Sequence, residues 1–295
     1  MLAPDQITAE NTAKAVPAPV AHTEFAAAKI NLALHVLGRR LDGYHALDSI
    51  VAFADVGDRL QFSWASQTEL TIDGDFAAGL SKGPDNLIMR AHDALLEVMT
   101  IGPVHMQLTK NLPVASGIGG GSADAAAALR GLLHLSGKTL PRAMLSEIAL
   151  SLGADVPVCL AGQASRMSGI GEHVQPFTKL PWLGIVMVNP LQPCSTSEVF
   201  RHLSLAKGQI HGSGLDPERP ETWRNDLTAA ALKTLPLIGE ILAALQRLDR
   251  LTHVRMSGSG ATCFGLASSF ADAQAAATSL RKKYPNWWIA AASLH

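Results

Sequence analysis

Apolar residues recur along the first half of the chain with spacings that predict both strands and helices. Residues Phe25–Leu37 alternate and are rich in apolar side chains, as expected of a buried strand. Residues Pro141–Leu152 have helical spacing and are followed by Gly153, a residue typical of helix C-termini. The same patterns predict strands at Leu47–Phe53, Arg59–Trp64, Glu69–Ile72 and Val104–Thr109, a turn at Asp55–Asp58, and helices at Asp85–Met99 (with an acidic cap) and Ser122–Leu135.

The pattern changes after Gly162, where glycine and polar residues occupy Gly162–Gly171. Residues Phe200–Glu221 are polar and interrupted by glycine and proline, which predicts a long surface loop. The other segments predict strands at Leu183–Val188, Val254–Met256, Thr262–Leu266 and Trp287–Ala292, and helices at Phe270–Lys283 and at Asp226–Leu248, the latter broken near Pro236. The order strand–turn–strand–helix–strand at the end of the chain indicates a split β-α-β half-domain. We therefore predict an α+β protein without internal repeats.

Composition narrows the class of protein. The 295 residues are 47% hydrophobic, which suffices for a large core and two domains. The formal net charge is −1 and no basic stripe is present, so we expect no nucleic-acid partner. No apolar run reaches the ~18 residues of a membrane span, so we expect no membrane partner. The composition leaves the oligomeric state open.

The N-terminal residues and the cysteines suggest a cytoplasmic protein. Residues 1–22 lack a positively charged start with a hydrophobic block, and we interpret them as a loose N-terminal extension. Cys159, Cys194 and Cys263 lie far apart and form no C-x-x-C pair, so we predict buried thiols in a reducing compartment. The histidines show no metal-binding spacing, and we predict no structural zinc.

The most informative segment is Leu112–Ala128, a glycine cluster that leads directly into an alanine-rich helix. Glycines at 117 and 119–121 let the backbone approach a bulky anion, and Ser122 or Asp124 could cap the helix. Unpaired N–H groups and the helix dipole make such a terminus a phosphate-binding site. The segment does not match G-x-G-x-x-G, because Ser122 stands where glycine is required. The Walker pattern G-x-x-x-x-G-K-[ST] also fails at Gly137-Lys138-Thr139, because position 132 is leucine rather than glycine. The alternative interpretation is a glycine-rich turn that only packs a strand on a helix.

Three further features could belong to the same site. Met256–Ala261 (MSGSGA) lies between two predicted strands. It is either a tight hairpin, or a turn that braces the phosphate loop or approaches a substrate from the opposite side. Lys29 is the only charged residue between Phe25 and Leu37, and could be either an exposed edge residue or a functional one. Asp155, followed by Pro157, could cap a short helix and still expose one carboxylate oxygen at a cleft.

Together these blocks resemble the GHMP kinases, a superfamily of small-molecule kinases, from about Ala26 to near the end of the chain. The resemblance depends on four ordered blocks, which are Ala28–Leu32 (AKINL) with Asp42–His45 (DGYH), the GIGGGSADAA glycine loop, Gly153–Pro157 (GADVP) and Ser257–Ala261 (SGSGA). The DGYH block is similar to that of the family acting on 4-diphosphocytidyl-2-C-methyl-D-erythritol in non-mevalonate isoprenoid synthesis, whereas mevalonate and homoserine kinases share only the loop. The alternatives are another GHMP kinase, a nucleotide-binding module without transfer activity, or a glycine-rich structural protein.

The resemblance implies a two-domain fold with the active site in the cleft between the domains. An N-terminal ribosomal-protein-S5-like domain that binds ATP would span 23–164, and a C-terminal split β-α-β (ferredoxin-like) domain would span 165–295. The chain departs from the common loop form L-P-x-G-[AG]-G-L-G-G-G at Ala115 and Ser116, where a positive φ is costly, so the path of the loop is an open question.

The resemblance also implies a role for each matching residue. Lys29 and Asp155 would be the catalytic pair, Tyr44 and Phe200 would enclose the cytosine ring, and His45 and Asn31 would hydrogen-bond the substrate. The ATP phosphates would be held by Pro113, Val114, Ala115, Ser116, Gly117, Ile118, Gly119, Gly120, Gly121, Ser122 and Ala123. ATP would donate its γ-phosphoryl group to the 2-hydroxyl of the methylerythritol unit. Mg²⁺ would bridge the phosphates, with Ser122 as its best protein contact and water and phosphate as most of its shell. Phe200 could instead be an ordinary core aromatic residue.

Overall fold

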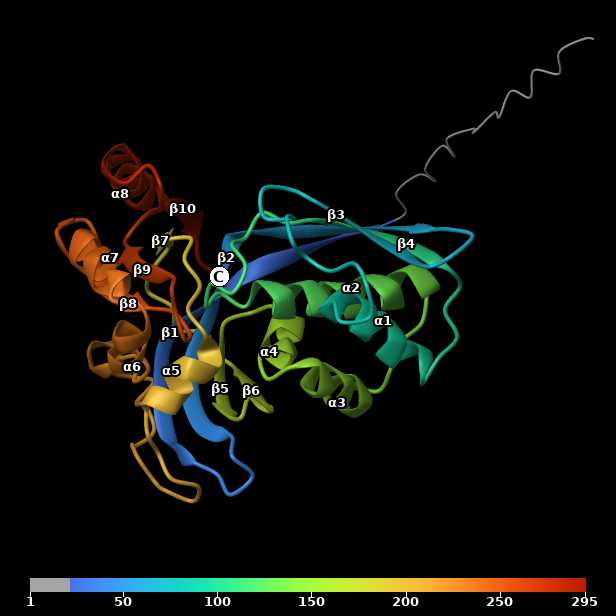
Figure 1. Ribbon diagram of the computed structural model, residues 1–295, viewed down its shortest axis with the longest axis horizontal. Helices are drawn as coiled ribbons and strands as arrows, with labels where there is room; N and C mark the ends of the chain where they lie inside the picture. The colour runs from blue at the N-terminus through green and yellow to red at the C-terminus, as the bar shows by residue number, and fades with distance from the viewer. Residues whose placement is uncertain (1–21) are drawn as a thin grey trace, which may run out of the picture.

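The computed structural model describes residues 22–295, and nearly all of the predicted N-terminal extension at 1–22 lies outside the described residues. Two sheets organise the described part of the chain. The first has six strands, in the order β3-β4-β2-β5-β6 with β1 paired to β2, and the second has four, in the order β10-β7-β9-β8. Helices α1–α4 lie on one side of Figure 1 and α6–α8 on the other, with β1 and β2 reaching between them. The predicted α+β class is confirmed.

The first sheet is built on a long antiparallel hairpin. Its strands are β1 (His22–Arg39), β2 (His45–Trp64), β3 (Glu69–Asp73), β4 (Val104–Thr109), β5 (Ser165–Gly169) and β6 (His173–Pro176). The predicted turn at Asp55–Asp58 is wrong, because β2 continues through it while pairing with β1 across a register shift at Ala27/Ala28. The strands β5 and β6 follow the expected domain division at 164–165, yet they join this first sheet through β2.

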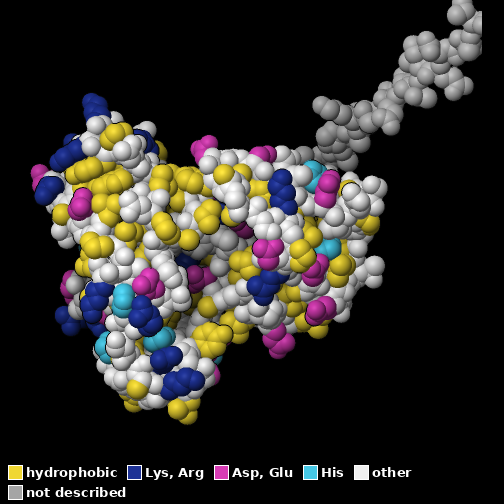
Figure 2. All heavy atoms as spheres, in the orientation of Figure 1, with side chains coloured by type: hydrophobic (Ala, Val, Ile, Leu, Met, Phe, Trp, Pro, Cys, Tyr) yellow, Lys and Arg dark blue, Asp and Glu magenta, His cyan; other side chains and the backbone are white. Residues whose placement is uncertain are grey.

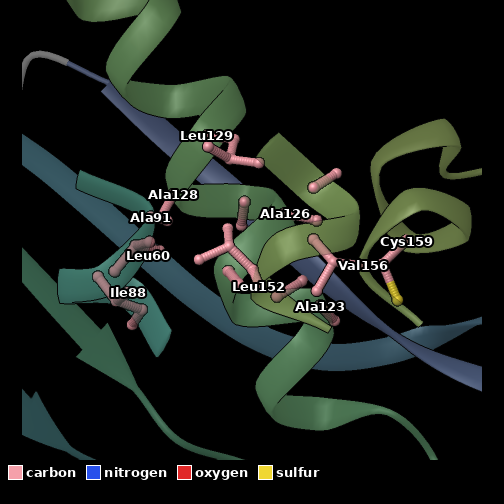
Figure 3. Packing of buried hydrophobic residues seen from close by; sticks show 14 of the residues in the cluster. Leu60, Ile88, Ala91, Ala123, Ala126, Ala128, Leu129, Leu152, Val156 and Cys159 are labelled. Atoms are coloured by element: carbon pink, nitrogen blue, oxygen red, sulfur yellow. The ribbon is translucent and has the colours of Figure 1, made fainter. Parts of the chain in front are cut away.

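Helices cover one face of the first sheet. They are α1 (Leu87–Leu96), α2 (Gly120–Ser136), α3 (Arg142–Leu152) and α4 (Val156–Ala161). Figure 3 shows Ala123, Ala126 and Ala128 of α2 among larger residues of its neighbours. Small side chains let α2 pack closely here, and a Cβ at Gly131 would lie 2.1 Å from the Phe62 ring. This tight packing holds the N-terminus of α2 in a fixed place.

The second sheet has the strand order of a split β-α-β domain, as predicted. Its strands are β7 (Gly184–Asn189), β8 (Thr252–Met256), β9 (Cys263–Ala267) and β10 (Trp288–Ser293), and its helices are α5 (Thr196–His202), α6 (Thr228–Thr234), α7 (Leu237–Gln246) and α8 (Phe270–Lys283), with a 3-10 turn at Pro220–Thr222. The break between α6 and α7 falls at Pro236, as the sequence predicts. The predicted loop at Phe200–Glu221 is confirmed except at its two ends.

The long strands β1 and β2 also bind the second domain. Leu34 donates its N–H to the Arg224 carbonyl and accepts from the Asp226 N–H, and the Asp226 carboxylate accepts from the Val36 N–H. On β2, Phe53 and the terminal His295 exchange two backbone hydrogen bonds. The domains are therefore joined through the strand that carries Lys29. No helix in residues 22–295 is both long and apolar enough to span a bilayer.

Candidate active site

A cavity of about 1050 Å³ lies between the two domains and is lined by both. The space-filling view shows the surface hollowed between the two halves of the molecule (Figure 2). Of the predicted site residues, those that line the cavity are Lys29, Asn31, Tyr44, His45, Asp155, Phe200, Pro113, Val114, Ala115, Ser116, Gly117, Gly119, Gly120, Gly121 and Ser122. Ile118 and Ala123 do not line it, because their side chains are buried in the hydrophobic core. The structure thus brings together residues from four separate blocks of the sequence.

The glycine loop ends in a helix whose first N–H groups have no side-chain cap. Gly119 is the N-cap of α2, with φ of 66°, and within residues 22–295 no side chain caps this helix. The predicted caps Ser122 and Asp124 are therefore wrong, because α2 begins two residues earlier, at Gly120. An uncapped helix N-terminus at a cavity presents unpaired donors and a positive dipole end. This terminus can bind an anion.

The variant part of the loop contains a left-handed residue that is not glycine. Ala115 adopts φ of 51°, a conformation that costs an L-residue about 1–2 kcal/mol. The next residue, Ser116, is buried, and its hydroxyl donates to the Pro113 carbonyl at 2.6 Å, which closes the turn. The departure from the common loop form is therefore accommodated by one strained alanine and one side-chain hydrogen bond.

The second glycine turn braces the first. Ser257 donates its hydroxyl to the Gly117 carbonyl at 3.0 Å and accepts the Asn31 N–H at 3.1 Å. The Thr262 N–H donates to the Ser116 carbonyl at 3.0 Å. A Cβ at Gly117 would lie 2.6 Å from the carbonyl oxygens of Ser257 and Gly260, so this contact requires glycine. The segment Met256–Ala261 therefore braces the glycine loop, and it also connects the antiparallel strands β8 and β9 as a hairpin, so these two interpretations are both confirmed.

Lys29 and Asp155 form an ion pair in the cavity. The Lys29 ammonium lies 2.9 Å from Asp155 Oδ2, with the lysine side chain 3% exposed and the aspartate side chain 34% exposed. The edge-residue interpretation of Lys29 is wrong, since the residue is buried and a Cβ at Gly119 would lie 3.0 Å from its Cε. Asp155 occupies the N-cap position of α4, as the sequence suggested, but its carboxylate makes no capping hydrogen bond. The pair lies beside the glycine loop.

A hydrogen-bond chain holds Lys29 in this position. Its ammonium donates to Asn31 Oδ1 at 2.9 Å, and Asn31 Nδ2 donates to the Ser49 hydroxyl at 2.8 Å. Ser49 in turn donates to the Ala33 carbonyl at 2.6 Å. All of these side chains are buried. Asn31 therefore orients the ammonium, and its predicted hydrogen bond to substrate stays a prediction.

Aromatic residues line the opposite end of the cavity. Tyr44 is 61% exposed, and the ring of His45 lies 4.8 Å from that of Phe200, centroid to centroid. Burial, together with the nearby Arg39 charge, lowers the pKa of His45 below its usual value. This imidazole is therefore neutral at pH 7 and keeps one donor and one acceptor nitrogen.

A buried charge cluster at the base of the loop was not found from the sequence. Lys110 binds the carboxylates of Asp58 and Asp124, and all three side chains are buried. Asp58 Oδ1 also accepts the N–H groups of Asn111 (2.6 Å) and Leu112 (2.8 Å), which fixes the entry to the glycine loop. Of these three residues, only Asp124 gave a signal in the sequence, as the one charged residue in an alanine-rich segment.

We expect the Asp124→Asn substitution to remove a pH dependence of stability. Burial, opposed by Lys110 and reinforced by the Asp58 charge, raises the pKa of Asp124 to about 7. The folded state then binds more protons than the unfolded state between about pH 4 and 7, so this group's contribution to stability falls as pH rises through that window. The variant cannot titrate at this position, so its stability relative to wild type should rise by about 3 kcal/mol between pH 5 and 8.

Urea unfolding of both proteins at pH 5 and pH 8 measures this difference. Asp75→Asn, at an exposed carboxylate in the loop after β3, serves as the control and should follow the wild type at both pH values. Parallel pH dependence in wild type and Asp124→Asn would contradict the assignment.

A divalent cation would find few protein ligands here. In residues 22–295 no group of three or more His, Cys, Asp or Glu side chains could hold a metal ion. Ser122 and Asp155 line the cavity and could each contribute an oxygen. This donor set suits a cation held mainly by phosphate and water.

Comparison with known proteins agrees with the geometry. The model of the GHMP kinases N-terminal domain matches residues 86–163, and that of the GHMP kinases C-terminal domain matches 215–286. The chain is 50% identical to a 4-diphosphocytidyl-2-C-methyl-D-erythritol kinase of Rhizobium leguminosarum bv. trifolii, covering 91% of this chain and 93% of the relative. It is 48% identical to the protein of that name from Paramagnetospirillum magneticum, covering 91% and 97%.

Solved structures show the same relationship. A crystal structure of 4-(cytidine 5'-diphospho)-2C-methyl-D-erythritol kinase superposes with a TM-score of 0.77 at 32% identity, covering 92% of this chain and 99% of that one. Homoserine kinase from Cytophaga hutchinsonii shares the fold with a TM-score of 0.65 at 15% identity, covering 92% and 93%. The chain belongs to the GHMP kinases and, within them, to the family of 4-diphosphocytidyl-2-C-methyl-D-erythritol kinases.

Proposed function

We propose that this protein transfers the γ-phosphoryl group of ATP to the 2-hydroxyl of 4-diphosphocytidyl-2-C-methyl-D-erythritol, giving the 2-phosphate and ADP. The observation that carries the proposal is the Lys29–Asp155 pair, which lies in one cavity with the uncapped N-terminus of α2. The family membership supports both ATP as co-substrate and the acceptor.

The phosphates of ATP are assigned to the glycine loop. The N–H groups of Gly119–Ser122 lie at the N-terminus of α2, where the helix dipole favours a negative charge. Pro113 has no N–H, so its part is to shape the loop rather than to bind phosphate. Mg²⁺, when bound with ATP, would neutralise charge on the phosphates, and Ser122 is the hydroxyl best placed to contact it.

The catalytic pair acts on the acceptor hydroxyl. An alcohol is a weak nucleophile at neutral pH, and a positioned base contributes typically 10²–10⁴-fold. Lys29 engages Oδ2 of Asp155, so we assign Oδ1 as the oxygen that accepts the hydroxyl proton. The Lys29 ammonium orients this carboxylate and is placed to stabilise the charge that develops on the transferred group.

The cytidine base is assigned to the aromatic end of the cavity, between Tyr44 and Phe200. His45 packs on Phe200 and, being neutral, can both donate to and accept from the edge of a base. The exposed Tyr44 ring would then cover the other face of the base. This arrangement separates recognition of the base from phosphoryl transfer.

We expect Tyr44→Ala to weaken binding of the cytidyl substrate while leaving ATP binding unchanged. Loss of one base–aromatic stack costs about 1–3 kcal/mol, which corresponds to a rise in KM of roughly 5- to 150-fold. Steady-state kinetics with each substrate varied in turn measures both effects. Leu41→Ala, at 79% exposure in the same turn, is the control. An equal loss of ATP affinity in Tyr44→Ala would contradict the placement.

Phosphorus NMR tests the proposed reaction directly. The purified protein, ATP, Mg²⁺ and the cytidyl substrate should give a new phosphomonoester resonance together with ADP. ADP release with mevalonate or homoserine instead would indicate a different GHMP kinase. ATP binding without any product would indicate a binding module.

We also infer a cytoplasmic location, which the buried free thiols of Cys159, Cys194 and Cys263 support.

A further inference from the structure

Arg39 joins the two sides of the aromatic end of the cavity. It is the last residue of β1, is half-buried, and lines the cavity. Its Nε donates to the Gly43 carbonyl at 3.2 Å, and its Nη1 donates to the Leu205 carbonyl at 3.0 Å. Gly43 precedes Tyr44 and His45, whereas Leu205 follows the helix that carries Phe200. One guanidinium thus bridges the two segments that carry the aromatic residues.

The backbone of Arg39 strengthens the same connection. Its N–H donates to the Gln209 carbonyl at 2.9 Å, and its carbonyl accepts the Gly208 N–H at 2.7 Å. The segment that follows α5 is therefore bound to the end of β1 over several residues. Leu205 is buried, so its carbonyl would lose a hydrogen bond in a poorly hydrated place if the guanidinium were removed.

We propose that Arg39 is a positioning residue for recognition of the cytidine base, because it sets the distance between the Tyr44–His45 turn and the helix that carries Phe200. A flat base fits between two aromatic side chains only at the right separation, so small movements of either segment weaken stacking. This inference rests on the proposed function. It assigns to Arg39 no contact with the substrate.

The fork of a guanidinium is suited to this task in a way that an ammonium is not. Its nitrogens lie in one plane at fixed directions, so it can donate to two carbonyls in different segments at once. A lysine at 39 keeps the charge and a similar aliphatic chain, but its single ammonium can reach only one of the two carbonyls well. Charge and bridging can therefore be separated by substitution.

The charge of Arg39 also supports the same site. Together with burial, it lowers the pKa of His45, whose ring contacts Phe200. Lysine and arginine side chains gather over this end of the molecule (Figure 2), and the neighbouring Arg40 is exposed and pairs with Asp42. Arg40 is not among the residues lining the main cavity. It provides a matched control one residue away.

The experiment compares Arg39→Lys and Arg39→Gln with Arg40→Gln in steady-state kinetics. We expect both Arg39 variants to raise the KM for the cytidyl substrate by about 10- to 100-fold, with kcat at saturation and the KM for ATP within about threefold of wild type. Arg40→Gln should match the wild type. A merely structural role would change all three parameters or none. Thermal unfolding verifies that the variants are folded, and Arg39→Lys carries the test if Arg39→Gln is not.

A wild-type KM for the cytidyl substrate in Arg39→Lys would overturn the proposal, because charge alone would then be sufficient. An equal rise in the KM for ATP would also overturn it. If the wild-type protein forms no phosphomonoester, the proposed function fails, and the same variants are compared by calorimetry with cytidine diphosphate as the probe. A tenfold higher Kd in Arg39→Lys supports the bridging role, and an unchanged Kd overturns it.

Discussion

Asp155→Asn is expected to lower kcat by about 10²–10⁴-fold, the range of a lost general base, while ATP still binds. The amide is the same size as the carboxylate, and its oxygen can still accept a hydrogen bond from Lys29, so the local geometry should persist. The amide cannot take a proton from the acceptor hydroxyl at neutral pH. The change therefore separates proton transfer from positioning.

Single-turnover and steady-state kinetics, with ATP affinity measured by calorimetry, test this expectation. Asp249→Asn, an exposed carboxylate outside the cavity, is the matched control and should keep wild-type kcat. A kcat in Asp155→Asn within threefold of wild type would remove Asp155 from the mechanism. A parallel loss of ATP affinity would instead indicate that the carboxylate organises the glycine loop.

Elements with strong periodicity were predictable from the sequence, but their ends were less so. Helix α8 has the predicted bounds, since Ser269 caps it and its last turn is basic, as the helix rules require. Helix α2 begins earlier than predicted because Gly119, with no side chain, is its N-cap. The helix α1 is also shorter than predicted, and its cap is Asn86 rather than an acidic residue. Capping rules predict the start of a helix poorly where its first N–H groups face a cavity.

Tertiary pairing explains the elements that were missed. Residues of β5 are polar and contain Gly169, so they have little strand propensity, but they pair with the buried strand β2 from Leu47 to Val51. The predicted break in β2 rested on Asp55, Gly57 and Asp58. The Asp58 carboxylate is instead compensated by Lys110 and by two backbone N–H groups. Both features depend on residues far away in the sequence, which local patterns do not report.

The candidate site was predictable as blocks of sequence but not as geometry. Lys29 and Asp155 are distant along the chain, and composition and spacing alone left each with an ordinary structural interpretation. The resemblance paired them, and the fold brings their side chains to 2.9 Å. The Asn31–Ser49 chain and the bridging role of Arg39 depend on contacts between strands or domains, so they emerge only from the structure.

Lys29→Met is expected to lower kcat by about 10²–10⁴-fold, which is the range for loss of a proton-transfer or charge-stabilising group. We expect the fold itself to keep most of its stability. The lysine is buried, and removing one member of a buried ion pair is strongly destabilising only when the other charge stays buried without a partner. Its partner Asp155 is 34% exposed and can regain hydration. Asn31 Oδ1 does lose one hydrogen bond, at a cost of about 1 kcal/mol.

Activity and stability should therefore respond in different ways to this one substitution. Kinetics should show the loss in kcat, and urea unfolding should place the free energy of unfolding within about 2 kcal/mol of wild type. Lys179→Met, at an exposed pair with Glu218, should change neither quantity. Since Lys29 lies against the glycine loop, a large loss of stability together with activity would mean that its charge holds the loop rather than serving the transfer. Loss of activity alone supports the catalytic role, because the ammonium is then needed by the reacting groups and not by the folded structure.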